Sequence, residues 1–430
     1  MMNLVEKDTA YVWHPYTHQK GRLPSIPIVK GKNTLLYDQE GNTYIDAVSS
    51  WWVTIHGHGN KYIASRLGKQ AAILEQVIFA GFTHKPAVSL AEKLLKILPG
   101  DFARIFYSDN GSTATEVAIK MALQYWLNKE ASHRTRIVAL HDSYHGDTFG
   151  AMSISERGTF TMAFRDKLFE VIFIDPPHKD NLEQIKATLE PIAGEIACFI
   201  YEPLLQGAGG MKMYKPEHLD PLLHFLKQKE VLCIADEVLT GFYRTGKLFA
   251  GEYLTEKADI ICLSKGLTGG TMALGVTSCT QKVYEAFNTD DRTQTFFHGH
   301  SFTANPLACT ASLASMELVM KKKLKRRVGE IQAAQARFLE ELYPFAERKI
   351  IKNLRHLGTI CAFEIAISET EGYLAGIGQK FSAFCLKSGV YLRALGNTIY
   401  IMPPYCITDK ELRKVHQTIL RFLQQLIRNN

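Results

Sequence analysis

Six short apolar segments, each as long as a β-strand, alternate along the chain with segments of helical periodicity. A strand that is apolar throughout is typical of a mainly parallel sheet whose two faces are both covered. The order therefore predicts an α/β fold with a doubly wound core, in which ligands bind at the carboxyl ends of the strands. The apolar segments are 102–107, 136–140, 171–174, 197–201, 231–235 and 260–263.

The chain is long enough for more than one domain, because its 430 residues exceed an average single domain. Residues 357–365 and 390–403 read as an antiparallel cluster, and a helix follows in which Thr408 and Glu411 have capping-box spacing. We predict an N-terminal segment that joins a smaller α+β domain, and a large domain between them. The predicted bounds are 1–57 for the segment, 58–324 for the large domain and 325–430 for the small domain.

Composition limits the partners and the compartment. The net charge of +7 is spread thinly, and the one dense basic run, 321–327, ends a helical pattern and contains no aromatic residue. A solvated helix end explains that run better than a nucleic-acid site. The eight cysteines show no Cys-x-x-Cys spacing, which is typical of buried thiols in a reducing cytosol. Because the chain has no apolar signal core and no apolar stretch of ~20 residues, we expect a cytoplasmic protein with no membrane or nucleic-acid partner.

Lys265 follows the last apolar segment and precedes Gly266, Gly269 and Gly270. A lysine at the end of a buried strand has its ammonium near apolar walls. Desolvation there lowers the pKa of the amine, and the neutral amine can act as a nucleophile. The alternative for Lys265 alone is an ammonium that extends to water.

Asp236 ends the apolar segment 231–235. A carboxylate at the end of a buried strand can keep a pyridine nitrogen protonated, so that the ring draws electrons from a carbanion. An isolated Asp more often caps the next helix, which is the alternative here. The motifs that follow decide between the two.

Three motifs stand in order between Asp236 and Gly266: Asp-Glu-Val at 236–238, Thr-Gly-Phe-Tyr-Arg-Thr-Gly at 240–246 and Ser-Lys-Gly at 264–266. Together they resemble the signature of the class-III, fold-type-I aminotransferases, which depend on pyridoxal 5′-phosphate. The resemblance implies that the large domain binds this cofactor. It also implies that Asp236 faces the pyridine nitrogen and that Lys265 is the catalytic residue and binds the cofactor.

A further motif follows the segment 102–107 and precedes a helical pattern with one continuous apolar face. Free amides at the helix N-terminus can bind a dianion, together with the hydroxyls of Ser112 and Thr113. A simple helix cap is the alternative, but the resemblance implies that Gly111 and Ser112 bind the cofactor's phosphate. The apolar face consists of Ala114, Val117, Ala118, Met121, Ala122, Tyr125 and Trp126.

The resemblance also assigns residues around the cofactor ring. Tyr144 lies in a Tyr-His-Gly motif, and in relatives this aromatic residue covers the cofactor. Val238 is expected against the opposite face of the ring and Glu202 beside it. His141 and His145 could suggest a metal, but their loop offers no convincing third ligand, so we expect no zinc site.

Gly299, His300 and Ser301 form the next matching motif. In relatives a hydroxyl at the position of Ser301 crosses to the phosphate bound by the neighbouring subunit. The resemblance therefore implies a homodimer with shared active sites, in which His300 and Ser301 bind the cofactor and Gly299 lies beside the substrate. S-adenosylmethionine-using members have Gly-Pro-Thr here and a glycine at the position of Tyr243, so the chain departs from them at two places.

Two aromatic motifs narrow the substrate: Trp-His-Pro-Tyr-Thr at 13–17 and Ser-Ser-Trp-Trp at 49–52. They are similar to the 7,8-diaminononanoate synthases of biotin biosynthesis, in which aromatic residues line a pocket for a long apolar keto acid. Such a substrate ends in a carboxylate, so the pocket also needs an arginine. Arg393 matches the family's carboxylate-binding arginine, although a surface arginine at a strand end is the alternative. The expected substrate-binding residues are Tyr16, Trp51, Trp52, Tyr144, Lys265, Gly299 and Arg393.

The expected reaction is amino transfer to 8-amino-7-oxononanoate, which gives 7,8-diaminononanoate, with S-adenosylmethionine as the donor. Because His300 replaces the usual proline, lysine is an alternative donor. A broad class-III ω-aminotransferase shares every cofactor residue, but the two aromatic motifs argue against it. A catalytically silent cofactor-binding protein is the non-enzyme alternative, and Lys265, Asp236 and Tyr144 argue against it.

Overall fold

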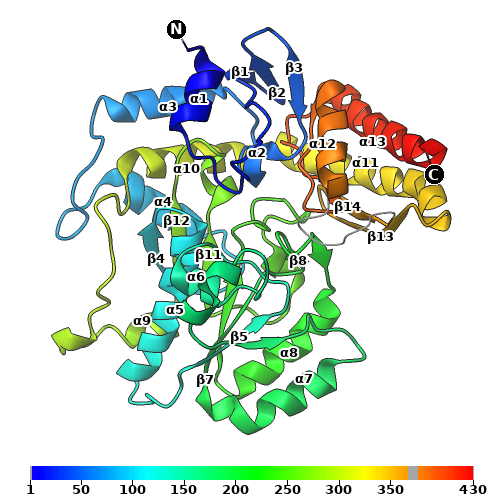
Figure 1. The fold of residues 1–430 in the computed structure, drawn as a ribbon. Coiled ribbons are helices and arrows are strands. Elements are labelled where there is room, and N and C mark those ends of the chain that lie inside the picture. The colour runs from blue at the N-terminus through cyan, green and yellow to red at the C-terminus, as the bar shows by residue number, and fades with distance from the viewer. Residues whose placement is uncertain (1, 367–375, 430) are drawn as a thin grey trace.

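The computed structural model describes residues 2–366 and 376–429. Figure 1 shows that helices surround a central sheet. The sheet has seven strands in the order β4-β12-β11-β10-β7-β5-β6. The strands from β11 to β6 run parallel, whereas β12 is antiparallel to both of its neighbours. The strands are β4 (Phe102–Ser108), β5 (Arg136–Leu140), β6 (Ile172–Ile174), β7 (Ile196–Tyr201), β10 (Leu232–Asp236), β11 (Ile260–Leu263) and β12 (Gly275–Thr280).

Each predicted apolar segment overlaps one strand of this sheet, which confirms the predicted α/β fold. The prediction omitted β12 because this strand carries hydroxyl residues in place of an apolar run. Thr277 Oγ1 donates to Ala114 O at 2.7 Å and Ser278 Oγ donates to Arg104 O at 2.8 Å. These buried hydroxyls are satisfied only once the fold has formed, so apolar periodicity does not reveal the strand.

Helices cover both faces of the sheet, and successive residues of a strand point to opposite faces. Ile137 and Ala139 of β5 lie in the core with α5, whereas Val138 and Leu140 lie in the core with α7 and α8. The predicted apolar face of α5 is buried throughout. Burial on both faces explains why the strands are continuously apolar. The main helices of this part are α4 (Lys85–Leu95), α5 (Gly111–Asn128), α7 (Leu182–Leu189), α8 (Pro216–Gln228) and α10 (Pro306–Val319).

A separate antiparallel sheet, β13-β14-β16, lies in the C-terminal part of the chain. The predicted antiparallel cluster is thus confirmed, but the segment 390–403 was wrongly read as one piece. Its first residues form β15, which pairs parallel with β3 in the four-stranded sheet β1-β2-β3-β15 and so joins the two ends of the chain. The domain boundaries stay predictions. The strands are β1 (Ile28–Lys32), β2 (Leu35–Asp38), β3 (Thr43–Asp46), β13 (Ile351–Leu357), β14 (Ile360–Ile365), β15 (Val390–Tyr391) and β16 (Thr398–Ile401).

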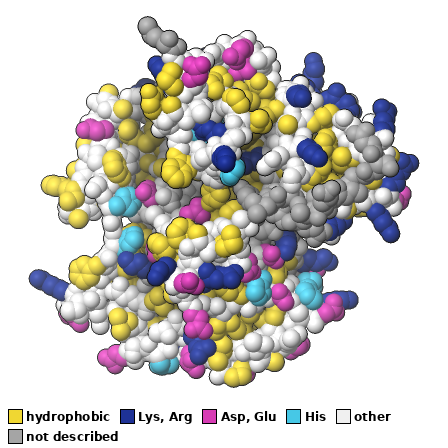
Figure 2. All heavy atoms as spheres, in the orientation of Figure 1, with side chains coloured by type: hydrophobic (Ala, Val, Ile, Leu, Met, Phe, Trp, Pro, Cys, Tyr) yellow, Lys and Arg dark blue, Asp and Glu magenta, His cyan; other side chains and the backbone are white. Residues whose placement is uncertain are grey.

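Three helices accompany these sheets: α11 (Lys322–Glu347), α12 (Gly376–Lys387) and α13 (Asp409–Asn429). The capping box before α13 is confirmed, since Thr408 N donates to Glu411 Oε2 at 2.7 Å and Glu411 N donates to Thr408 Oγ1 at 3.2 Å. The basic run was misplaced: it begins α11 instead of ending a helix, because no glycine or proline marks the break after α10. Figure 2 shows Lys and Arg side chains gathered over this part of the molecule, at the upper right of the view.

Across residues 2–366 and 376–429, no helix is both long and apolar enough to cross a membrane. All eight cysteines are free thiols; Cys406 is half-buried and the others are buried, as predicted. The remaining elements are short or peripheral. They are α1 (Leu4–Tyr11), α2 (Ser49–Trp52), α3 (Lys61–Ala71), α6 (Phe149–Ser153), α9 (Gln281–Glu285), β8 (Leu205–Gln206), β9 (Lys212–Met213) and the 3-10 helices Met162–Lys167, Glu190–Glu195, Ala250–Tyr253, Lys265–Thr268 and Arg292–Gln294.

Candidate active site

A cavity of about 770 Å³ lies where the predicted motifs meet, and we call it the main cavity. It includes the ends of β10 and β11, the start of α5, and residues from the N-terminal and C-terminal segments. Most of the predicted site residues line it. These are Tyr16, Trp51, Trp52, Gly111, Ser112, Tyr144, Glu202, Asp236, Val238, Lys265 and Arg393.

Gly299, His300 and Ser301 do not line the main cavity. They line a separate cavity of about 630 Å³, together with Gln76 and Phe79. Within one chain these three residues therefore do not meet Lys265 or Asp236 in one cavity. Their assigned roles stay predictions that depend on a second subunit.

Lys265 begins a 3-10 helix directly after β11 and has a positive φ of 43°. Its Nζ lies 4.7 Å from the centroid of a Trp52 ring. Burial lowers the pKa of Lys265, while the carboxylates of Asp236 and Glu202 act in the opposite direction. The lowered pKa agrees with the prediction and favours the neutral, nucleophilic amine.

The backbone turn at Lys265 is held from behind by a hydrogen-bonded chain. Ser315 Oγ donates to Gly266 O at 3.2 Å, and His56 Nε2 lies 3.0 Å from Ser315 Oγ. Because the hydroxyl proton goes to Gly266 O, His56 Nε2 is the donor to Ser315. Burial lowers the pKa of His56 to about 4, so the ring is neutral at physiological pH. His56 lies outside the aromatic motifs at 13–17 and 49–52, and its contact behind Lys265 was not predicted.

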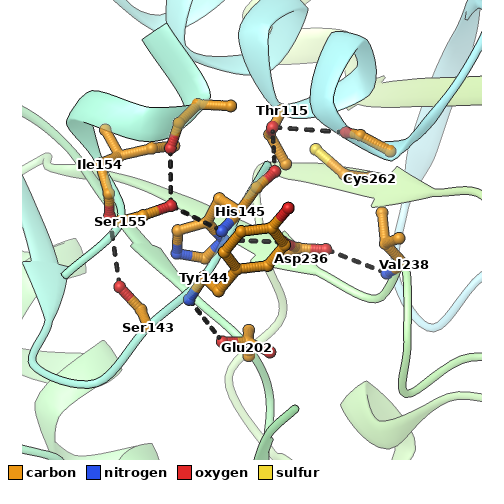
Figure 3. Close-up of polar contacts among 12 residues, drawn as sticks. Thr115, Ser143, Tyr144, His145, Ile154, Ser155, Glu202, Asp236, Val238 and Cys262 are labelled. Carbon is orange, nitrogen blue, oxygen red and sulfur yellow. Dashed lines mark hydrogen bonds and ion pairs between the residues drawn. The ribbon is translucent and has the colours of Figure 1, made fainter. Parts of the chain in front are cut away.

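Asp236 holds two neighbours at once, as Figure 3 shows. Its Oδ2 lies 2.7 Å from His145 Nδ1, and its Oδ1 accepts from Val238 N at 3.0 Å. The backbone of His145 is fixed in turn by Ser155 Oγ at 2.8 Å and Thr115 Oγ1 at 2.9 Å. The buried His145–Asp236 pair keeps one carboxylate in a fixed place on the cavity wall. Sequence reasoning noted His145 only as a possible metal ligand and missed this partnership.

Glu202 lies beside this pair and accepts from Tyr144 N at 3.1 Å (Figure 3). It also accepts from Gly207 N at 2.8 Å. Burial raises the pKa of Glu202. The nearby charge of Asp236 also raises this pKa, whereas His145 lowers it. Glu202 and Asp236 thus share the cavity wall, and burial favours the neutral form of Glu202. Within the described ranges, no three His, Cys, Asp or Glu side chains are grouped so as to hold a metal ion.

The N-terminus of α5 supplies donors to the main cavity. Asn110 is the N-cap of α5 and forms a capping box with Thr113. Thr113 Oγ1 also donates to Asp109 Oδ1 at 2.8 Å. The Thr113 hydroxyl is therefore already hydrogen-bonded, and its part in binding a dianion stays a prediction. Ser112 Oγ accepts from Asp147 N at 3.1 Å, which leaves its hydroxyl proton for a ligand.

Aromatic rings form the outer wall of the main cavity. The Tyr16 ring meets Trp51 and Phe160 edge-on, at centroid distances of 5.5 and 5.6 Å, and Tyr16 Oη lies 3.1 Å from Tyr144 Oη. Burial and the hydrogen bond with Tyr16 raise the pKa of Tyr144. The Arg393 guanidinium lies 4.5 Å from a Trp51 ring centroid. A cation thus stands at the end of an aromatic wall; Phe160 was missed because no motif surrounds it.

The turn that presents the tryptophans is strained and supported. Ser49, Ser50 and Trp52 all have positive φ values. Asp46 stabilises the turn, because its buried carboxylate accepts from Ser50 N at 2.7 Å and lies 2.8 Å from His58 Nε2. His58 therefore supports the aromatic wall indirectly, through Asp46.

The comparisons with known proteins agree with this site. Residues 16–423 match the family described as Aminotransferase class-III. An adenosylmethionine-8-amino-7-oxononanoate aminotransferase from Synechococcus elongatus is 43% identical over 426 residues, which cover 97% of this chain and 99% of the relative. The Helicobacter pylori protein of the same name is 36% identical, over an alignment that covers 99% of this chain and 98% of that relative.

Solved structures show the same fold. A crystal structure of an enzyme of that name from Methanocaldococcus jannaschii aligns with a TM-score of 0.92 at 33% identity, covering 98% of both chains. An amine transaminase from an uncultivated Pseudomonas species, solved in its PLP-bound form, is 28% identical with a TM-score of 0.88, covering 95% of this chain and 97% of its own.

The residues of the main cavity fit pyridoxal 5′-phosphate. Lys265 offers an amine of lowered pKa, Asp236 offers a buried carboxylate for the pyridine nitrogen, and Ser112 offers a hydroxyl at a helix N-terminus for the phosphate. A Cβ at Gly111 would lie 2.8 Å from Val238 Cγ1, so the space between helix and strand requires glycine there. The chain belongs to the class-III aminotransferases, a family of enzymes that depend on pyridoxal 5′-phosphate.

Proposed function

We propose that this aminotransferase transfers an amino group to 8-amino-7-oxononanoate and forms 7,8-diaminononanoate, with S-adenosylmethionine as the amino donor. Eight curated relatives, 34 to 43% identical, are all named adenosylmethionine-8-amino-7-oxononanoate aminotransferase. The observation that carries the proposal is the aromatic wall that ends at Arg393 in the cavity of Lys265.

The chemistry of the acceptor suits this wall. Its alkyl chain needs apolar surfaces, and its terminal carboxylate needs a cation with a fixed orientation. Trp51 and Tyr16 supply the surfaces, and Arg393 packs on Trp51 with its guanidinium in the cavity. Arg393 and Lys265 line the same cavity, which suits an acceptor whose reacting ketone lies away from its carboxylate.

The cofactor, when bound, supplies the electron sink that stabilises negative charge at the donor carbon. Lys265 Nζ, whose neutral form burial favours by lowering its pKa, takes the proton from that carbon. Asp236, held by His145, provides the fixed negative charge for the pyridine nitrogen. The second half of the reaction runs these proton movements in reverse on the acceptor, and Lys265 returns the proton.

The assembly follows from the predicted motif at 299–301. The segments around Gln76 and Ser301 lie side by side, because the Gln76 amide donates to Ser301 O and Asn305 Nδ2 donates to Glu75 O at 3.2 Å. Ile78 and Phe302, in the same two segments, expose 61% and 64% of their surface. Such exposed apolar side chains beside a cavity suit a cytoplasmic homodimer in which Ser301 and His300 reach the partner's cofactor.

The test mixes the purified, cofactor-loaded protein separately with S-adenosylmethionine and with lysine. Absorbance then follows conversion of the pyridoxal to the pyridoxamine form of the cofactor. Conversion by S-adenosylmethionine supports the proposal, whereas conversion by lysine alone makes lysine the donor. Conversion by neither, combined with conversion by simple amines, would identify a broad ω-aminotransferase. Lys265→Ala is the control, because it removes the proton carrier and should show no turnover.

A further inference from the structure

Tyr400 lies in β16 and lines the main cavity, although the sequence motifs assigned it no role. It exposes only 3% of its surface. Trp52 Nε1 lies 3.0 Å from Tyr400 Oη, and an indole nitrogen can only donate. The Tyr400 oxygen is therefore the acceptor in this hydrogen bond, and its own proton is left for another acceptor.

The hydroxyl proton of Tyr400 finds no acceptor among residues 2–366 and 376–429. Burial raises the pKa of Tyr400, and the nearby charge of Arg393 acts in the opposite direction. The raised pKa keeps the proton on the hydroxyl at physiological pH. Buried donors without an acceptor are rare in folded proteins. Because Tyr400 lines a cavity, a bound ligand can supply the missing acceptor.

A tight hairpin places Tyr400 opposite Arg393. Leu395 N donates to Thr398 O at 2.9 Å, and Thr398 N donates to Leu395 O at 3.0 Å, so these two residues form an antiparallel pair. Two residues further along each arm, the same register sets Arg393 opposite Tyr400. Residues two apart in an extended chain point to the same side. Arg393, Leu395 and Tyr400 accordingly all line the main cavity.

Trp52 links Tyr400 to the reacting end of the cavity. Lys265 Nζ lies 4.7 Å from the centroid of a Trp52 ring, and the rings of Trp52 and Tyr400 meet edge-on with centroids 6.2 Å apart. The indole therefore contacts both the reacting amine and the hydroxyl. Its hydrogen bond fixes the Tyr400 oxygen in the cavity wall.

We infer that Tyr400 is a substrate-binding residue, whose hydroxyl donates a hydrogen bond to the substrate's carboxylate while Arg393 balances its charge. A cation and a neutral O–H donor on one cavity wall suit a carboxylate, because its two oxygens accept several hydrogen bonds. The inference rests on the proposed function, which supplies a keto acid with a terminal carboxylate. Tyr400 thus adds a direction-dependent contact to the attraction of the guanidinium.

The experiment measures the binding of nonanoate and of nonan-1-ol to the cofactor-loaded protein by isothermal titration calorimetry. Both probes have nine carbons and no ketone or amine that could react, but only nonanoate carries a charge. We expect the ratio of the nonanoate Kd to the nonan-1-ol Kd to rise about 10-fold in Tyr400→Phe, because a hydrogen bond to a charged group contributes more than one to a neutral group. Altered packing against Trp52 should weaken both probes alike and leave the ratio unchanged.

Tyr405→Phe is the matched control. Tyr405 is buried in the same segment, but its hydroxyl already donates to Phe242 O at 2.6 Å and it does not line the main cavity. Its ratio of the two Kd values should equal that of the unchanged protein. Arg393→Ala should raise the ratio, which checks that the ratio reports on the carboxylate.

An unchanged ratio in Tyr400→Phe, in a variant that still binds cofactor and melts normally, would overturn the inference. Equal weakening of both probes would do the same and would leave Tyr400 as a support for Trp52 alone. Failure of the unchanged protein to prefer nonanoate would also contradict it. If S-adenosylmethionine and the keto acid fail as substrates, the proposed function falls, but the ratio still decides whether Tyr400 binds a carboxylate.

Discussion

At the scale of single residues, the site separates groups that react from groups that hold them. Lys265 and Asp236 were predicted from motifs at strand ends that resemble the class-III signature, and both line the main cavity. Their supports, His145 for Asp236 and Ser315 for the Lys265 turn, come from segments far away in the sequence. Motif reasoning finds the first group because its chemistry is tied to a short local pattern.

Replacing Arg393 should separate the two halves of the reaction. Arg393→Ala removes the cation of the aromatic wall, and a hydrogen bond to a charged group contributes about 1.5–3 kcal/mol. We expect KM for the keto acid to rise about 10- to 100-fold, with the S-adenosylmethionine half-reaction nearly unchanged. Single-turnover absorbance measurements of each half give the two values. Arg136→Ala, which alters a surface ion pair with Glu195, is the control; an equal loss in both halves would contradict the role.

Removing the hydroxyl behind Lys265 should slow the chemistry without weakening binding. Ser315→Ala leaves Gly266 O and His56 Nε2 without their partner, and a buried polar group without a partner costs about 1–3 kcal/mol. We expect kcat to fall about 10-fold with little change in KM, because the loosened turn no longer fixes Nζ. The pH titration of the cofactor's absorbance should shift as well.

Ser312→Ala is the matched control for this variant. Ser312 is buried one turn earlier on α10, and its Oγ has no hydrogen-bond partner among the described residues. Its removal should leave kcat and the absorbance titration as they are. If both serine variants behave alike, Ser315 has no special role at Lys265.

At the scale of elements, packing between helices decides the response to pH. His416 of α13 stacks on Phe338 of α11 with a centroid distance of 4.0 Å, and its Nε2 donates to Gln335 Oε1 at 3.0 Å. Burial, strengthened by Arg413 and Arg337, lowers the pKa of His416 to about 3. An unfolded chain binds the proton near pH 6.5, so stability from this group falls as the pH drops from about 6.5 toward 3.

His416→Gln should flatten this acid dependence. Glutamine keeps an N–H donor for Gln335 but does not titrate. The titration of His416 lowers the free energy of unfolding by up to about 1.4 kcal/mol per pH unit below pH 6.5, and the variant should not show this loss. The melting temperature at pH 7.5 and at pH 5.5 measures the effect. The difference in melting temperature between pH 7.5 and pH 5.5 should be smaller in His416→Gln than in the unchanged protein. The exposed His133→Gln should leave it unchanged, and the same difference in all three proteins would refute the assignment.

At the scale of the whole molecule, the predicted motif at 299–301 lies outside the main cavity of its own chain. If the active sites are shared, a hybrid dimer of Lys265→Ala and Ser301→Ala subunits has one site with both defects and one intact site. Ser301→Ala alone should bind cofactor about 10- to 100-fold more weakly, since it loses a hydrogen bond to a charged phosphate. At limiting cofactor, the purified hybrid should therefore regain about half the activity of the unchanged dimer.

Two affinity tags, one on each variant, allow the hybrid to be purified. Both parental dimers serve as controls, with Lys265→Ala inactive and Ser301→Ala weak at that cofactor concentration. A hybrid no more active than the Ser301→Ala parent would place Ser301 within its own subunit's site or outside any site.

The sequence by itself determined the parallel core and predicted the reacting groups, because continuous apolar strands and the motifs at their ends are local patterns. It did not reveal β12, whose buried hydroxyls find acceptors only in the folded chain, nor the split of 390–403 between two sheets. Tertiary structure alone decided that His145 holds Asp236 and that Trp52 donates to Tyr400. Such contacts join residues of distant segments, and their energy comes from burial and geometry that no single segment contains.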